Sequence, residues 1–234
     1  MDDASRRWCL VLPVKRLVSA KTRLGPPYDG DRARLALAFA LDTAAAALAC
    51  PLVVAVQVVT DEPEAAAALA AVGAEVTGDA PDAGLNPALV HGATFASRAH
   101  PGTSVGALAA DLPALRPAEL TAALRAAARH GRSFVRDAAG TGTTLLLSRS
   151  ARDLRPMFGP GSAARHAGSG AHEVDPVSFP SLTRDVDTAA DLDAAAALGL
   201  GPWTAGLLAG RPLHPPGTGE ARAGQARAGQ VRAG

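Results

Sequence analysis

Aromatic residues are scarce in this sequence of 234 residues, and neither sign of charge dominates it. Only 3% of the residues are aromatic, so the chain has few rings on which the bases of single-stranded nucleic acid could stack. The 23 lysines and arginines nearly balance the 22 aspartates and glutamates, which leaves a net charge of +1. Because no strong positive field gathers polyanions, we predict no binding to nucleic acid or to an anionic membrane surface.

Cysteines and long hydrophobic runs are also few. Cys9 and Cys50 both adjoin apolar runs, a position typical of reduced core thiols rather than of disulfides or a zinc site. Apolar runs such as 51–59 have about half the roughly 20 residues of a membrane-spanning helix. The beginning of the chain lacks the basic segment with which a secretory signal starts. These features predict a cytoplasmic protein without a membrane span.

The sequence does contain 48% hydrophobic residues, and short apolar runs alternate with longer segments rich in alanine and leucine. The short runs predict strands and the long segments predict helices. Strands are expected at 8–14, 52–60, 74–76, 104–110, 133–136 and 143–148, and helices at 32–49, 62–72, 87–98 and 117–130. Strands that are apolar throughout are buried on both faces, so we expect an α/β fold with a mostly parallel sheet covered by helices.

Capping residues and a change of composition mark the predicted boundaries. Asn86 stands before Pro87 as the N-cap candidate of one helix, and Thr188 is the capping candidate of the last predicted helix. After residue 210 the sequence becomes rich in proline and glycine and then repeats Ala-Arg-Ala-Gly-Gln, without apolar periodicity. We therefore expect one domain over residues 1–210 and a disordered low-complexity tail over residues 211–234.

A basic loop follows the first predicted strand, which ends near Pro13. The loop contains Lys15, Arg16, Lys21 and Arg23. Ligands of α/β proteins bind beyond the carboxyl ends of the strands, and cations at that place neutralise phosphates. A solvated basic loop without a ligand explains the same residues equally well. The loop is not a P-loop, because the GxxxxGK[ST] pattern is absent, and no GxGxxG dinucleotide motif follows the first strand.

Three aspartates stand at the ends of apolar segments that are far apart in the sequence. Asp111 closes the apolar run 105–110, and Asp185 and Asp187 come just before the last predicted helix. Carboxylates at strand ends beside a basic loop can hold Mg²⁺, which takes oxygen ligands and bridges substrate phosphates. The alternative is a structural role, in which Asp187 or Thr188 caps the helix and Asp111 opens a turn.

Three glycine-containing loops complete the candidate site. Backbone N–H groups and hydroxyls in 137–144 and 158–162 could bind a carboxylate or a phosphate. A plain hairpin turn explains the glycines of the first of these loops equally well. The loop 82–89, which contains Gly84 and Asn86, could read the edge of a nucleobase or simply cap the following helix.

In this order, the segments resemble the family of 2-phospho-L-lactate and phosphoenolpyruvate guanylyltransferases, which act in the biosynthesis of the deazaflavin coenzyme F420. The matching segments are 13–15, 20–24, 84–86, 111–113, 140–144, 158–159 with Ser162, 165–166 and 185–188. The resemblance implies a nucleotide-diphospho-sugar transferase fold of the GT-A type. That fold is a Rossmann-like three-layer sandwich whose mixed, mostly parallel sheet has about seven strands, one of them antiparallel.

The resemblance also implies the reaction. A phosphate oxygen of a three-carbon phospho-acid attacks the α-phosphorus of GTP in line, and pyrophosphate leaves. Because the nucleophile is already an anion, positioning and charge neutralisation carry the rate, with Mg²⁺ as the expected cofactor. The residues implied for each role are Lys15, Lys21 and Arg23 for catalysis and the triphosphate; Pro13, Gly84 and Asn86 for the rest of the nucleotide; Thr144, Gly159 and Ser162 for the acceptor; and Asp111, Asp185 and Asp187 for the metal. His166 is left open as a further acceptor-site residue.

Two other interpretations stay open. Another nucleotidyltransferase of this fold, of the molybdopterin or sugar-phosphate type, usually carries an LxxGxGxR loop where this chain has Leu12-Pro13-Val14-Lys15. A non-catalytic nucleotide-binding protein would have lost the metal carboxylates, which persist here. The sequence does not separate phosphoenolpyruvate, 2-phospho-L-lactate and 3-phosphoglycerate as acceptors. The expected partners are GTP, the phospho-acid and the next pathway enzyme, which would receive an unstable product, and a homodimer is a further expectation.

Overall fold

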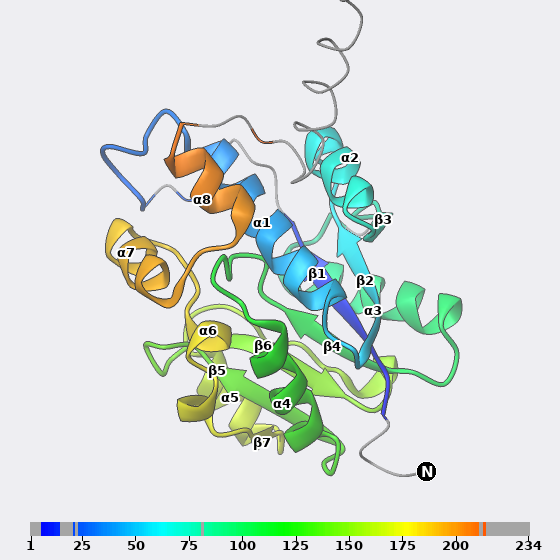
Figure 1. Cartoon of the computed structure of the whole chain (residues 1–234). Helices are drawn as coiled ribbons and strands as arrows, with labels where there is room; N and C mark the ends of the chain where they lie inside the picture. Colours follow the sequence, from blue (N-terminus) through cyan, green and yellow to red (C-terminus); the bar gives the residue numbers. More distant parts are fainter. Residues whose placement is uncertain (1–5, 15–20, 22, 81, 211–212, 214–234) are drawn as a thin grey trace, which may run out of the picture.

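A seven-stranded sheet forms the centre of the computed structural model, which describes residues 6–14, 21, 23–80, 82–210 and 213. The strands are β1 (Trp8–Pro13), β2 (Val53–Val59), β3 (Glu75–Thr77), β4 (Ser104–Leu108), β5 (Arg132–Arg136), β6 (Thr143–Ser148) and β7 (His172–Glu173). Their order across the sheet is β3-β2-β1-β4-β6-β5-β7 (Figure 1). The sheet is mixed, because β6 runs antiparallel to its neighbours β4 and β5, whereas β1, β2, β3 and β4 pair in parallel, as do β5 and β7.

The single antiparallel strand confirms the mixed, mostly parallel sheet that the resemblance implies, and it identifies β6 as the strand whose direction the hydrophobic pattern did not reveal. Every residue of β6 is buried, as is every residue of the parallel strand β4, so burial alone carries no information about direction. The connection between β5 and β6 is too short for a parallel crossover. As a result, the carboxyl ends of β1, β4 and β5 and the beginning of β6 lie at one edge of the sheet.

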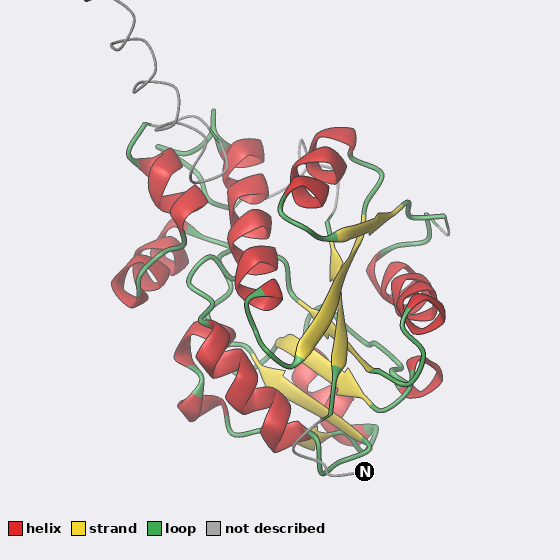
Figure 2. Ribbon diagram, turned by 45° about the vertical axis from the view of Figure 1, so that its right-hand side comes forward, coloured by secondary structure: helices red, strands yellow, loops and turns green. Residues whose placement is uncertain are grey.

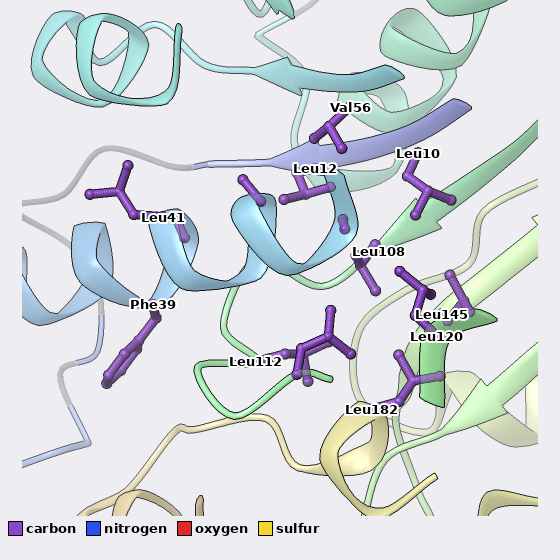
Figure 3. Close-up of a cluster of buried hydrophobic side chains, with 14 of the residues drawn as sticks. Leu10, Leu12, Phe39, Leu41, Val56, Leu108, Leu112, Leu120, Leu145 and Leu182 are labelled. Atoms are coloured by element: carbon purple, nitrogen blue, oxygen red, sulfur yellow. The ribbon is translucent and has the colours of Figure 1, made fainter. Parts of the chain in front are cut away.

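Helices cover both faces of the sheet, which confirms the three-layer sandwich (Figure 2). The larger core cluster contains residues of α1 (Arg32–Leu48), α2 (Pro63–Ala71), α4 (Pro117–Ala127), α6 (Pro180–Thr183), α7 (Ala189–Leu198) and α8 (Pro202–Leu208). The smaller cluster contains residues of α3 (Leu85–Ala99) and α5 (Ser162–Gly168). In β1, Leu10 and Leu12 belong to the first cluster and Val11 to the second, as the alternation of a strand requires. Figure 3 shows Leu10, Leu12 and Leu108 in the larger cluster.

The close approach of α3 to the sheet depends on a glycine. A Cβ atom at Gly92 would lie 2.5 Å from a methyl group of Val59 and 2.6 Å from one of Val11. Only glycine therefore allows the helix to lie this near to β1 and β2. This packing places α3 directly over the two strands whose carboxyl ends border the candidate site.

Several predicted boundaries are wrong. Helix α3 begins at Leu85 after Gly84, whose φ of 97° favours glycine, so Asn86 is not the N-cap. Thr188 does cap α7, as predicted, and its partner Asp191 completes a capping box. However, α7 is not the last helix, because α8 follows it. The short helices α5, α6 and α8 were not predicted, since each has at most two turns and offers little periodicity to recognise.

Three further predictions concern the cysteines, a membrane-spanning helix and the tail. Cys9 and Cys50 are buried and free, as expected. Among the described residues, no helix has the length and apolar character that crossing a bilayer requires. The predicted tail lies outside the described residues except for Leu213, which packs against the larger core cluster.

Candidate active site

A cavity of about 350 Å³ lies at the carboxyl ends of β1 and β4. Pro13 and Val14 line it at the end of β1, and Ala109, Ala110 and Asp111 line it beyond β4. The other lining residues are Lys21, Ala36, Ala40, Leu85, Leu89, Leu108, Phe158 and Asp187. The cavity has the volume of a small-molecule site, and its few polar groups lie together at one place.

Those polar groups form a cluster around the ammonium group of Lys21. The Nζ atom of Lys21 donates to Oδ2 of Asp111 and, over 3.0 Å, to Oδ1 of Asp187. Nη2 of Arg23 donates to the other oxygen of Asp187 over 3.0 Å. The structure thus brings together predicted residues from three distant segments. Lys15, the remaining predicted triphosphate ligand, lies outside the described residues.

Lys21 is held in a charged and strained state. Burial by itself would lower the pKa of its ammonium group, but Asp111 and Asp187 outweigh that effect and raise the pKa above its ordinary value. Its backbone has a φ of 55°, in the left-handed region that side chains other than glycine rarely adopt. Such strain is commonly found at functional sites, where the surrounding contacts maintain it.

Backbone hydrogen bonds join the two segments that carry the carboxylates. The N–H group of Val186 donates to the carbonyl oxygen of Asp111 over 3.1 Å. On the other side of Asp111, the N–H group of Leu112 donates to Oγ1 of Thr43 on α1 over 3.0 Å. Asp111 is therefore positioned from both sides by tertiary contacts, and one of these contacts joins it to the segment that carries Asp187.

The capping alternative for Asp187 is excluded by the geometry of α7. The Thr188 side chain accepts from the N–H group of Asp191, and an Asp191 oxygen accepts from the N–H group of Thr188 over 2.9 Å. Burial alone would raise the pKa of Asp191, but the hydrogen bonds from Thr188 lower it. Because Thr188 and Asp191 cap the helix, the carboxylate of Asp187 is left to face Lys21 and Arg23.

Asp185 lies beside the same carboxylates in a less solvated position. Burial, followed by repulsion from Asp111, Asp137 and Asp187, raises the pKa of Asp185 to about 7. In the described part of the chain, no three His, Cys, Asp or Glu side chains form a ready-made metal site. Asp111 and Asp187 therefore both contact Lys21. The three predicted metal ligands, Asp111, Asp185 and Asp187, do not form a ready-made metal site together.

A second cavity, of about 250 Å³, adjoins the first through shared lining residues Pro13, Val14 and Leu85. Its polar side is formed by Thr60, Asp61, Asp79, Asp82 and the predicted nucleotide residue Gly84. Oδ1 of Asp79 is buried and has no hydrogen-bond partner among the described residues. Asp82 begins the predicted loop 82–89, but sequence reasoning missed Asp61 and Asp79, although they follow β2 and β3 just as Asp111 follows β4.

Asn86 supports the wall of the first cavity. Its side-chain oxygen accepts from the N–H group of Phe158 over 2.8 Å, and its amide nitrogen donates to the Phe158 carbonyl oxygen over 3.1 Å. These two bonds hold Phe158 in the cavity wall, across a large separation in sequence. The predicted contact of Asn86 with the nucleobase stays a prediction.

The predicted acceptor residues lie near the cavities without lining them. Ser162 is buried, and its hydroxyl donates to Oγ1 of Thr143 over 3.2 Å. Thr144 is buried too, but its hydroxyl has no partner within the described part of the chain. Gly159 is exposed, with a φ of 118°, and follows the lining residue Phe158. Of these three residues, Thr144 is the one whose side chain is left with an unused hydrogen-bonding group.

His166 is a core residue, not an exposed member of the acceptor site. It is fully buried, with Nδ1 at 2.9 Å from Oγ1 of Thr143. Its Nε2 accepts from the N–H group of Met157 over 3.0 Å, so the neutral ring carries its proton on Nδ1. Burial, with the nearby charges of Arg132 and Arg165, lowers the pKa of His166 to about 4.

We expect His166→Gln to remove part of the loss of stability in acid. Between pH 6.5 and 4 the unfolded chain protonates this histidine and the folded chain does not, so the wild type loses stability as pH falls. The effect amounts to about 3 kcal/mol. Urea unfolding of both proteins at pH 7 and pH 4 measures it, because the difference between their free energies of unfolding should change by about that amount. A difference that is the same at both pH values would contradict the assignment.

Comparisons with known proteins identify a matching family and similar relatives. The family model described as "Guanylyl transferase CofC like" matches residues 8–201. The chain is 56% identical over 220 residues to a phosphoenolpyruvate guanylyltransferase of Thermomonospora curvata, covering 94% of this chain and 96% of the relative. It is 54% identical over 204 residues to a protein of the same name from Streptomyces coelicolor, covering 87% and 96%.

Solved structures with the same fold are more distant in sequence. A nucleotidyl transferase from Methanothermobacter has a TM-score of 0.53 at 20% identity and covers 82% of this chain and 97% of its own. A 4-diphosphocytidyl-2C-methyl-D-erythritol synthase has a TM-score of 0.55 at 12% identity and covers 82% and 99%. These similarities confirm the predicted nucleotidyltransferase type of fold.

Proposed function

The chain belongs to the family of CofC-like guanylyl transferases, and from this premise we propose that it joins GTP to phosphoenolpyruvate. A phosphate oxygen of the acid forms a bond to the α-phosphorus of GTP, the bond to the bridging oxygen breaks, and pyrophosphate leaves. The observation that carries the proposal is the convergence of Lys21, Asp111 and Asp187 in the wall of the first cavity, with Arg23 paired to Asp187. The cytoplasmic location, the homodimer and the hand-over of product remain predictions.

Lys21 and Arg23 are suited to bind the triphosphate. Both cations lie at the carboxyl edge of the sheet, where nucleotides bind in folds of this kind. The Lys21 side chain is only 12% exposed, and a charge shielded from water interacts more strongly with a phosphate. Since the attacking oxygen is already anionic, the residues must neutralise repulsion and position the two substrates, and no general base is required.

The carboxylates that surround Lys21 fit a magnesium ion. Mg²⁺ is usually held by one or two carboxylates together with substrate phosphates and water. Asp111 and Asp187 already converge on one cationic group, and Asp185 is near enough for repulsion to raise its pKa. We propose Asp111 and Asp187 as the ligands, with Asp185 assisting. When bound, the ion would offset the charge of the triphosphate and of the departing pyrophosphate.

The second cavity is suited to the guanine base. Guanine presents N–H donors at N1 and N2, and carboxylates accept such bonds strongly. Asp61, Asp79 and Asp82 provide carboxylates beside Gly84, and the unpartnered Oδ1 of Asp79 is the acceptor with the most to gain. The shared wall of Pro13, Val14 and Leu85 lets one nucleotide extend across both cavities.

We expect Asp79→Asn to raise the KM for GTP about tenfold or more while leaving the KM for phosphoenolpyruvate nearly unchanged. The loss of one bond to a charged acceptor costs roughly 1.5 to 3 kcal/mol. Steady-state kinetics with each substrate varied in turn measures the effect. Asp193→Asn, an exposed residue on α7, makes the same charge change away from both cavities and serves as the control. An equal rise in both KM values would place Asp79 outside the base site.

Pyrophosphate release by the purified full chain tests the proposed reaction. GTP, ATP and CTP are each supplied with Mg²⁺ and with phosphoenolpyruvate, 2-phospho-L-lactate or 3-phosphoglycerate. We expect release with GTP and phosphoenolpyruvate, accompanied by a guanylylated product seen in mass spectra of rapidly quenched samples. Release that requires CTP would favour another nucleotidyltransferase. Tight GTP binding without release for any of the acids would favour the non-catalytic alternative.

A further inference from the structure

A second group of cationic side chains lies at the edge of the sheet opposite Lys21. Strands β5 and β7 begin at this edge and β6 ends there, whereas β5 ends and β6 begins at the catalytic edge. Three arginines and two histidines line a cavity of about 460 Å³; they are Arg132, Arg149, Arg155, His130 and His172. Asp153 is the one carboxylate among the described residues that line it. The cavity is therefore rich in positive charge, although the chain as a whole is nearly neutral.

Backbone carbonyl groups hold two of these arginines in place. Arg132 donates to the carbonyl oxygens of Leu154 over 3.1 Å and of Ser169 over 3.3 Å. Arg149 donates to the carbonyl oxygen of His130 over 3.2 Å. These bonds restrict the movement of both guanidinium groups. A carbonyl group satisfies a donor without cancelling its charge, so Arg132 attracts an anion without a further ordering cost.

Basic groups lie close together inside the cavity. The rings of His130 and His172 stack with centroids 3.7 Å apart and an angle of 12° between their planes. Burial, followed by His172, Arg129 and Arg149, lowers the pKa of His130. Burial, followed by Arg155, also lowers the pKa of Arg132, against the weaker opposing effect of Asp153. An anion placed among these groups would relieve the repulsion.

Arg155 is the cation most available to a ligand. Its side chain is exposed and has no hydrogen-bond or ion-pair partner in the described part of the chain. Its backbone has a φ of 46°, so the residue is held in the left-handed region at a cost in strain. In the described residues only Lys21, Asp82 and Arg155 have this conformation without being glycine, and each lines one of the three cavities discussed here.

We propose that this basic cleft binds a small anion that carries a phosphate group, at a site separate from the catalytic cavity. The planar fork of Arg155 matches phosphate oxygens, the fixed charge of Arg132 lies beside it, and a phosphate of charge −2 neutralises more of the excess than one carboxylate does. The volume of the cleft is typical of a small-molecule site. The ligand is thus a free phosphorylated metabolite or inorganic phosphate, which share this chemistry.

NMR titration of the full chain tests the proposal, with the imidazole signals of His130 and His172 as local reporters. Inorganic phosphate, glycerol phosphate and succinate are added at constant ionic strength, with chloride as the balancing anion. We expect saturable shifts of both signals with either phosphate compound and weaker binding of succinate. Comparing the affinities of the two phosphate compounds shows whether the site prefers inorganic phosphate or an organic phosphate. Because the reporters lie at the opposite edge from Lys21, phosphate bound in the catalytic cavity is detected separately.

Two variants make the test specific. Arg155→Gln should weaken phosphate binding by roughly tenfold or more, because it removes a cation that provides a fork for the anion. Arg152→Gln removes the same charge from the neighbouring η3 helix (Ala151–Asp153) but does not line the cleft, and it should bind within about twofold of the wild type. Shifts that chloride reproduces, unchanged binding by Arg155→Gln, or tighter binding of succinate than of either phosphate compound would each overturn the proposal.

Discussion

Asp187→Asn is expected to lower turnover with GTP and phosphoenolpyruvate by at least about a hundredfold, which corresponds to roughly 3 kcal/mol of transition-state stabilisation. The substitution keeps the size of the side chain and removes the charge that faces Lys21 and Arg23. Because Thr188 and Asp191 cap α7, the helix does not depend on Asp187. The carboxylate is also 43% exposed, so we expect the free energy of unfolding to change by no more than about 1 kcal/mol.

The measurement is pyrophosphate release at saturating substrates over a range of Mg²⁺ concentrations, together with urea unfolding. Asp111→Asn should behave in the same way, and higher Mg²⁺ should restore part of the activity in each variant. Asp193→Asn, on the exposed side of α7, is the control and should retain nearly full turnover. Near-normal rates at low Mg²⁺ in both Asp187→Asn and Asp111→Asn would remove the proposed metal site.

Lys21→Met is the second substitution with a large expected effect, a loss of about a hundred- to a thousandfold in kcat/KM for GTP. The ammonium group performs two tasks in this structure. It contacts both carboxylates, whose mutual repulsion it offsets, and it is more buried than Arg23, the other described cation of the proposed triphosphate site. Lys21→Arg keeps the charge but presents a planar fork in place of a compact ammonium group, so we expect it to recover only a small part of the activity.

Kinetics with each substrate varied separate the two tasks of Lys21. If the residue acts in the transition state, kcat falls as well as kcat/KM; if it only binds GTP, KM rises and kcat is kept. We expect a fall in both quantities, since charge moves onto the leaving pyrophosphate during the reaction. A loss smaller than about tenfold in Lys21→Met would show that the triphosphate is neutralised by other residues.

The sequence by itself determined the layers of the fold and the family. Short apolar runs alternate with alanine-rich helices, and the side chains of Leu10, Val11 and Leu12 divide between two cores as a buried strand requires. The order of polar motifs along the chain predicted a guanylyltransferase, which the family match confirms. Both features are local: they depend on which residues are polar and on their spacing, and not on what they contact.

Tertiary structure alone decided the direction of β6 and the composition of the sites. Hydrophobic periodicity reports burial, which is the same for a parallel and an antiparallel central strand, so direction depends on pairing with β4 and β5. The predicted role of Asn86 as an N-cap was wrong. Helix α3 begins after Gly84, whose φ is positive, and the side-chain amide of Asn86 bonds to the backbone of Phe158 instead.

The site itself could be predicted only in part for the same reason. Strand-end reasoning identified Lys21, Asp111 and Asp187 as polar residues at one edge, but their convergence depends on a hydrogen bond between Val186 and Asp111. The basic cleft was not predicted at all, because its arginines and histidines come from strand ends and loops that no spacing in the sequence relates. Contacts between distant segments are fixed by strand pairing and core packing, and a local pattern contains neither.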